Sequence, residues 1–85
     1  KRADTVQRIT GRKRQKLRDE LFEREPLCRS CAGRGYVTAA TERDHIIPLA
    51  EGGTEDEDNV QPLCKDCHDA KSLEERKRGR QRATT

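Results

Sequence analysis

The stretch Asp44–His68, DHIIPLAEGGTEDEDNVQPLCKDCH, decides how this chain folds. It ends in a Cys-x-x-Cys pair, Cys64 and Cys67. A second such pair, Cys28 and Cys31, lies earlier in the chain, and 32 residues separate Cys31 from Cys64. Two pairs of this kind can each give two thiolates to one tetrahedral zinc ion. The spacing therefore predicts a four-cysteine zinc site that closes off the segment between the pairs.

The composition explains why the chain needs such a site. Of its 85 residues 29% are hydrophobic and 2% aromatic, too few for a large core. Four thiolates leave no open position on zinc, so the predicted role is structural. Three alternatives stay open: disulfides, a redox dithiol, and a zinc site of three cysteines with His68. No signal peptide or membrane span is recognised, so we expect a cytoplasmic protein with reduced thiols and no membrane partner.

The charge is distributed unevenly. Residues 1–24 carry a formal net charge of +5, residues 25–70 of −6 and residues 71–85 of +4. Basic ends around an acidic centre suit a protein that grips DNA phosphates with its ends and holds cations in the middle. Solvated tails are the alternative. With Phe22 and Tyr36 as its only aromatic residues, the chain has no stacking platform, which favours binding that is largely independent of sequence. The predicted DNA contacts are Arg12, Lys13, Lys16, Lys71 and Arg76, although Lys71 also suits a simple solvated lysine.

The predicted elements form a small α+β domain: a helix, a β-hairpin and a helix, clamped by zinc. Strong helix formers without a β-branched run predict the first helix, and Ile46–Ile47 is the strongest β-branched pair. Thr54-x-x-Glu57 and Ser72-x-x-Glu75 resemble capping boxes, for one helical turn and for a separate last helix. The expected helices are 11–24, 64–71 and one from 72, and the expected strands are 36–39, 41–47 and 60–63. The expected domains are a mobile basic arm over 1–10, a folded unit over 11–79 and a basic tail over 80–85.

Four polar residues in the deciding stretch suit phosphodiester chemistry. Adjacent residues at a strand end diverge, so Asp44 suits a hard cation and His45 suits a water molecule as general base. Asn59 is expected to bond the backbone of the His45 loop. On a helix His68 points about 100° away from Cys67, so the two can serve different metals. Packing or surface roles for His45 and a simple turn role for Asn59 stay open.

The spacing His45–x13–Asn59–x8–His68 is similar to the motif of the HNH endonucleases. Asp44 before the first histidine, and the Cys-x-x-Cys-His-x-x-Lys ending at Lys71, resemble the zinc-bearing phage and prophage branch. The resemblance implies a ββα-metal (His-Me finger) fold and hydrolysis of DNA to 5′-phosphate and 3′-hydroxyl ends. It further implies Mg²⁺ or Mn²⁺ on Asp44 and His68, His45 as general base, and Asn59 as support for the loop.

Some relatives place a third metal ligand one turn beyond the last histidine. Lys71 and Ser72 stand there in this chain, so two protein ligands are expected. We expect a monomeric nuclease acting on DNA, with a terminase-like phage packaging complex as a candidate partner. Two rivals stay open: a zinc-stapled DNA-binding module without catalysis, and a protein-interaction module that uses the acidic loop.

Overall fold

The computed structural model of the protein describes the backbone of residues 11–84 and the side chains of residues 11–80. The predicted arm over 1–10 lies outside the described residues. The first described helix, α2, is Gly11–Arg24, as predicted. It buries Leu21, and it ends before Glu25–Pro26 because a residue that precedes proline is disfavoured in the α conformation. A short helix, α3 (Arg29–Gly33), follows at the first cysteine pair.

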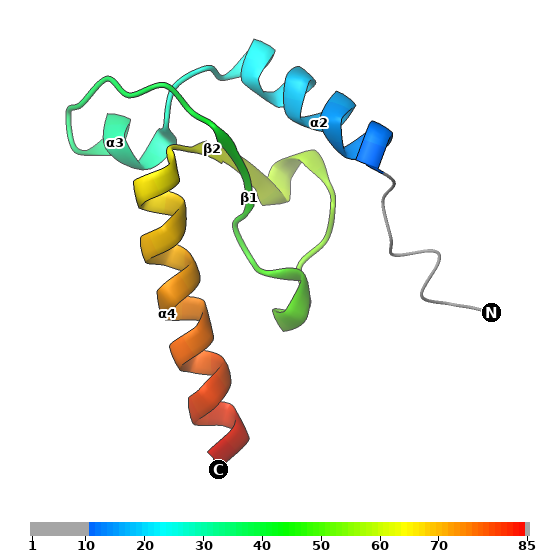
Figure 1. Cartoon of the computed structure of the whole chain (residues 1–85), viewed down its shortest axis with the longest axis vertical. Helices are drawn as coiled ribbons and strands as arrows, with labels where there is room; N and C mark the ends of the chain where they lie inside the picture. The colour runs from blue at the N-terminus through cyan, green and yellow to red at the C-terminus, as the bar shows by residue number, and fades with distance from the viewer. Residues whose placement is uncertain (1–10, 85) are drawn as a thin grey trace.

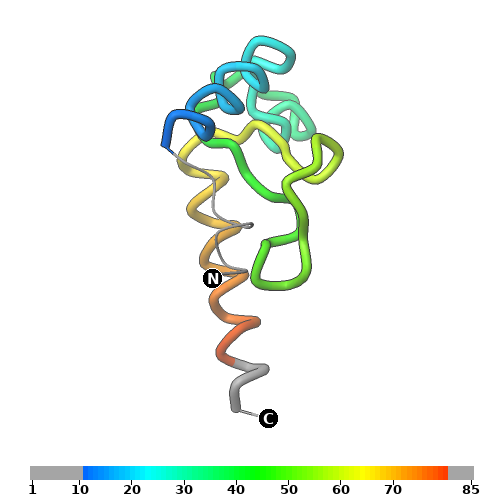
Figure 2. The backbone as a smooth tube through the Cα atoms, turned by 90° about the vertical axis from the view of Figure 1, so that its right-hand side faces the viewer, coloured from blue at the N-terminus to red at the C-terminus, as the bar shows by residue number. Residues whose placement is uncertain are grey.

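A two-stranded antiparallel sheet lies at the centre of the fold (Figure 1). Strand β1 (Glu42–His45) pairs with β2 (Val60–Leu63), so that Asp44 faces Gln61 across the ladder. The connection between the strands contains two single 3₁₀ turns, Leu49–Glu51 and Glu57–Asn59. Helix α4 (Lys65–Thr84) starts directly after β2, and its far half projects beyond the rest of the domain (Figures 1 and 2).

Two of the strand predictions need correction. Residues 36–39 form no strand, and only an isolated bridge joins Ala39 to Leu27. The strand expected over 41–47 ends at His45. The reason is that the Asn59 side chain takes both the N–H and the carbonyl of Ile47, which therefore cannot continue the ladder. Ile46 and Ile47 are consequently exposed despite their β-branched side chains.

The helix predictions also need correction in detail. A single helix runs through Ser72, where a new helix was expected, because Glu75 bonds Lys71 one turn earlier instead of capping a start. The same helix includes residues 80–84, which were expected in a tail. The predicted turn near Thr54 exists over Glu57–Asn59, with Asp56 as its N-cap and no capping side-chain bond.

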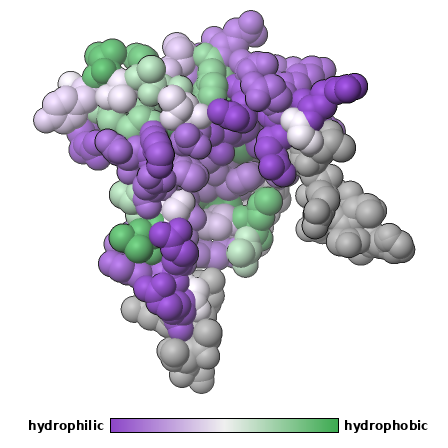
Figure 3. Space-filling model, in the orientation of Figure 1, coloured by the Kyte–Doolittle hydropathy of each residue, from purple (hydrophilic) through white to green (hydrophobic). Residues whose placement is uncertain are grey.

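The hydrophobic core is small, as the composition predicts. Its buried cluster consists of Leu63 and three cysteines, with Cys67 packed against it. The face shown in Figure 3 is mostly hydrophilic, with small hydrophobic areas between hydrophilic side chains. No helix in the described part of the chain is long and apolar enough to cross a membrane. Because apolar contacts are so few, the stability of the fold depends on the interactions of the cysteine side chains.

Candidate functional site

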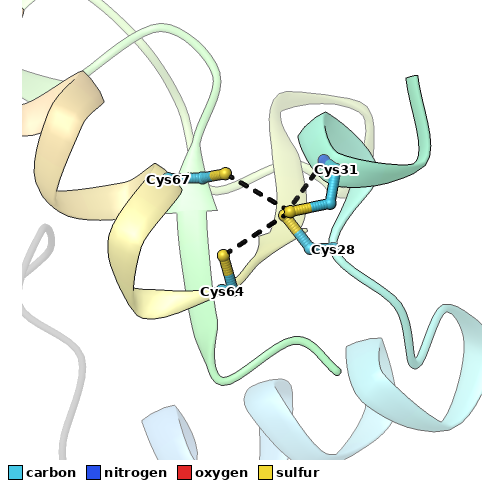
Figure 4. A group of neighbouring side chains, drawn as sticks. All are labelled: Cys28, Cys31, Cys64 and Cys67. Atoms are coloured by element: carbon cyan, nitrogen blue, oxygen red, sulfur yellow. Dashed lines mark hydrogen bonds between the residues drawn. The ribbon is translucent and has the colours of Figure 1, made fainter. Parts of the chain in front are cut away.

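The four cysteines converge from two helix starts, as Figure 4 shows. Cys28 and Cys31 lie at the start of α3, and Cys64 and Cys67 at the start of α4. Their sulfur atoms all lie within 4.8 Å of one another, and Cys31 Sγ is 3.8 Å from Cys64 Sγ and 3.7 Å from Cys67 Sγ. A tetrahedron with Zn–S bonds of about 2.3 Å has edges of about 3.8 Å. The cluster is therefore positioned to bind a metal ion, as the spacing predicted.

The same distances argue against two of the alternatives for the cysteines, the disulfides and the zinc site that includes His68. A disulfide needs sulfur atoms about 2 Å apart, and all four thiols are free. The metal-binding group contains all four cysteines without His68, against the alternative of three cysteines and a histidine. His68 follows Cys67 but is left for another role.

The surroundings of Cys28 and Cys64 shift the pKa values of these two thiols in opposite directions. Burial opposes ionisation of Cys28, but hydrogen bonds from the backbone of Cys31 and Cys64 outweigh it and lower its pKa to about 6. The backbone bond from Cys67 favours the Cys64 thiolate, yet burial and the neighbouring sulfurs raise its pKa to about 11. Four sulfurs this close cannot all ionise without a cation among them. Arg34 supplies positive charge from outside, with Nη2 3.6 Å from the sulfurs of Cys31 and Cys67.

The cluster also determines where the remaining polar residues lie. It ties the start of α4 to α3, while β2 leads directly into α4 and pairs with β1. As a result Asp44, His45 and His68 line one open cavity of about 230 Å³, with Ser72 and Glu75 on its helical wall. Three residues that the sequence singled out therefore meet in one place, although two come from a strand and one from a helix.

Asp44 is the most buried carboxylate of this cavity. Only 5% of the residue is exposed, and its Oδ2 accepts a hydrogen bond from Gln61 Nε2 at 2.9 Å. Lys71 Nζ lies 3.2 Å from the same oxygen, donates to the His45 carbonyl at 2.8 Å and contacts Glu75. Burial disfavours the ammonium, but its bonds to Glu75 and Asp44 outweigh burial and raise the pKa of Lys71. A cation therefore already stands beside the Asp44 carboxylate.

The His45 ring is held by an acid of the loop between the strands. Its Nε2 lies 3.0 Å from Oε1 of Glu55, and Arg43 Nη1 donates to that same oxygen at 3.0 Å. Burial opposes ionisation of Glu55, but the bonds from His45 and Arg43 outweigh it and lower the pKa of this carboxyl. Neither Glu55 nor Arg43 was singled out in the sequence. The loop contains several acidic residues, and the sequence does not indicate which of them contacts His45.

Asn59 lies outside the cavity and holds the loop behind it. Its Oδ1 accepts the Ile47 N–H at 2.9 Å, and its Nδ2 donates to the carbonyls of Ile47 at 3.1 Å and Thr54 at 2.8 Å. The predicted bonding of this amide to the His45 loop is confirmed. Gly53 makes the contact feasible, since a Cβ there would overlap the Ile47 carbonyl.

His68 lies one turn into α4, where its N–H bonds the Cys64 carbonyl at 2.9 Å. One third of its side chain is exposed, and its Nδ1 is 3.7 Å from the Asp69 carboxylate. The ring faces the cavity that contains Asp44, while the sulfur of its neighbour Cys67 belongs to the cysteine cluster. Cys67 and His68, although adjacent in sequence, therefore belong to two different groups of side chains.

A second cavity, of about 280 Å³, also borders His45. Arg14 and Arg18 of α2 line it together with Arg43, Glu42 and Glu55. The two helical arginines were missed, although their spacing of four residues puts them on one face of a helix.

The predicted DNA contacts differ in their surroundings. Exposed side chains are found at Arg12, Lys13, Lys16 and Arg76, whereas Lys71 is engaged with Asp44 and Glu75.

Comparison with known proteins gives one match. The family model described as HNH endonuclease matches residues 25–74, which is more than half of the chain. No curated protein and no solved structure matches. The matched segment contains both cysteine pairs, strands β1 and β2 and the first half of α4, which confirms the predicted ββα-metal fold. From this match and this fold, which imply a nuclease or DNA-binding role, we conclude that the chain belongs to the HNH endonuclease family.

Proposed function

We propose that the protein is a metal-dependent endonuclease that hydrolyses phosphodiester bonds in DNA. The observation that carries the proposal is the cavity in which Asp44, His45 and His68 meet. A buried carboxylate, an imidazole held from behind and a second imidazole give three distinct roles within one open site. The openness of the site suits a polymeric substrate, which must enter along a surface.

Two different metals fit the two groups of ligands. The four cysteines suit a structural zinc ion, because thiolates in a tetrahedron favour Zn²⁺ and leave no position for substrate. Asp44 and His68 suit Mg²⁺ or Mn²⁺, and the ammonium already beside Asp44 is an indication that this place accepts positive charge. When bound, such a cation supplies stabilisation of the charge that develops on the phosphate oxygens.

His45 is proposed as the general base. Its free ring nitrogen takes a proton from a water molecule, whose oxygen forms a bond to phosphorus as the bond to the 3′ oxygen breaks. The leaving 3′ oxygen takes a proton from solvent, which gives 3′-hydroxyl and 5′-phosphate ends. Asn59 acts indirectly, by fixing the loop that follows His45.

The basic residues of α2 are proposed to hold the DNA backbone. Arg14 and Arg18 border the cavity beside His45, and Arg12, Lys13 and Lys16 continue the same helix. Contacts of this kind read charge and spacing, so binding is expected to be largely independent of sequence. The phage-type branch, a terminase-like partner, the monomeric state and the cytoplasmic location stay predictions from the sequence.

A plasmid assay tests the proposed function. Supercoiled DNA with Mg²⁺ or Mn²⁺ should be converted to nicked or linear forms by the wild-type protein and not by His45→Ala. EDTA should stop the reaction. Salt-sensitive DNA binding without any cleavage by the wild-type protein would instead favour the non-catalytic, zinc-stapled DNA-binding module.

A further inference from the structure

We propose that Glu55 is a positioning residue for His45: its carboxylate holds the imidazole from behind and fixes which ring nitrogen faces the water. This inference rests on the proposed function. It starts from the contact between Glu55 Oε1 and His45 Nε2, which are 3.0 Å apart, with 34% and 24% of the two side chains exposed.

The linings of the two cavities separate Glu55 from the candidate metal ligands. His45 borders both cavities, whereas Asp44 and His68 line only the first and Glu55 lines only the second. The carboxylate therefore contacts the imidazole within the cavity that contains neither of the candidate metal ligands. In that place it can orient the ring without occupying the space that water and phosphate need.

The contact also determines the tautomer of His45. An ionised carboxylate only accepts hydrogen bonds, so Nε2 must carry the proton that lies between the two groups. Nδ1 is then left with a free lone pair, which is the form a general base needs.

The position of Glu55 is fixed by one direct contact and by the backbone that precedes it. Arg43 Nη1 donates to Oε1 at 3.0 Å, and only 8% of the Arg43 side chain is exposed, which restricts the position of the pair. The Asn59 amide bonds the Thr54 carbonyl on one side and the backbone of Ile47 on the other. It thereby ties the residue before Glu55 to the segment just after His45. One acid of the loop is thus selected for this contact by backbone geometry.

Steady-state cleavage by Glu55→Gln tests the proposal, with Glu57→Gln as the matched control. Glu57 is an exposed acid of the same loop, so both variants remove one negative charge near the DNA. We expect Glu55→Gln to lower kcat by about 10- to 100-fold, with KM for DNA and the Kd for Mn²⁺ within about twofold of wild type. Glu55→Asp should retain more activity than Glu55→Gln, and Glu57→Gln should match the wild type.

A second measurement needs no activity. The ¹⁵N chemical shifts of the His45 ring in the zinc-loaded wild-type protein, without Mg²⁺ or Mn²⁺ and at neutral pH, should show a proton on Nε2. Glu55→Gln should shift the ring towards a mixture of tautomers, and Glu57→Gln should not. A ring protonated on Nδ1 in the wild type, or an unchanged kcat in Glu55→Gln while the wild type cleaves DNA, overturns the proposal. Failure of the wild type to cleave DNA overturns the proposed function, and the ring shifts then still decide whether Glu55 fixes the tautomer.

Discussion

The Nζ atom of Lys71 lies 3.2 Å from Oδ2 of Asp44, so the carboxylate proposed to hold a divalent cation is already neutralised by a side chain of the same protein. Only 6% of the Asp44 side chain and 25% of the Lys71 side chain is exposed, which limits screening by solvent. Glu75 and the His45 carbonyl complete the surroundings of the ammonium group. We therefore expect Lys71 to compete with the proposed metal ion for Asp44.

Lys71→Met is expected to strengthen metal binding, because removal of the ammonium leaves Asp44 and Glu75 without their cation. Calorimetric titration of Mn²⁺ should show a Kd lower by about 5-fold or more, a typical coupling between two ligands of one site. Lys77→Met is the control, since Lys77 is on the same helix, half exposed and paired with Glu74. An unchanged Kd in Lys71→Met would show that the ammonium and the metal do not compete.

Helix α3 was not predicted and β1 is shorter than expected. The spacing nevertheless predicted that the polar and cysteine residues converge, because two Cys-x-x-Cys pairs are a strong sequence signal for one shared metal site. Contacts made by residues without such signals were missed. The acidic loop offers five acids, and only folding shows that Glu55 is the one that meets His45. Ile47 has strand propensity, yet the Asn59 amide takes its backbone groups. From the sequence, Lys71 could equally be a solvated lysine. Only the approach of β1 to α4 places it beside Asp44.

Loss of one cysteine is expected to unfold the domain. A structural zinc site contributes free energy of about 10 kcal/mol or more, whereas a core this small supplies a few. Cys28→Ser and Cys64→Ser should therefore lose far-UV helical signal and bind no stoichiometric zinc by metal analysis. Ala32→Ser, an exposed change in the same short helix, is the control and should keep both. A stably folded, metal-free protein in reducing buffer would contradict this prediction.

Gly53→Ala is expected to break the connection between the loop and Asn59. The added Cβ would overlap the Ile47 carbonyl and lie 2.9 Å from Asn59 Nδ2, so the loop must move. Urea unfolding should show a loss of about 1–3 kcal/mol, together with reduced cleavage of DNA. Gly33→Ala is the control, because a Cβ at Gly33 meets nothing within 4 Å. Equal stability of the two variants would mean that the loop tolerates the displacement.

The basic residues of α2 are expected to set the salt dependence of DNA binding. Each phosphate contact contributes about 0.9 to the slope of log K against log salt. Replacing Arg12, Lys13 and Lys16 together by Gln should therefore reduce the slope by up to about 3, with similar losses on unrelated DNA sequences. Arg29→Gln, whose guanidinium is already held by Glu25, should leave the slope nearly unchanged. Fluorescence anisotropy at several salt concentrations gives the slopes, and a salt-independent, site-selective footprint would contradict the prediction.

The two histidines are expected to fail in different ways. His45 is proposed to accept a proton, so His45→Ala should abolish turnover and leave the Kd for Mn²⁺ nearly unchanged. His68 and Asp44 are proposed to share one cation, so His68→Ala and Asp44→Ala should each lose both metal binding and turnover. Zinc should stay on the four cysteines in all three variants, because the sulfur cluster includes none of these residues. Calorimetric titration of Mn²⁺ beside the plasmid assay separates the roles. Equal loss of Mn²⁺ in all three variants would reject His45 as the base, and full activity in His45→Ala would reject the nuclease mechanism.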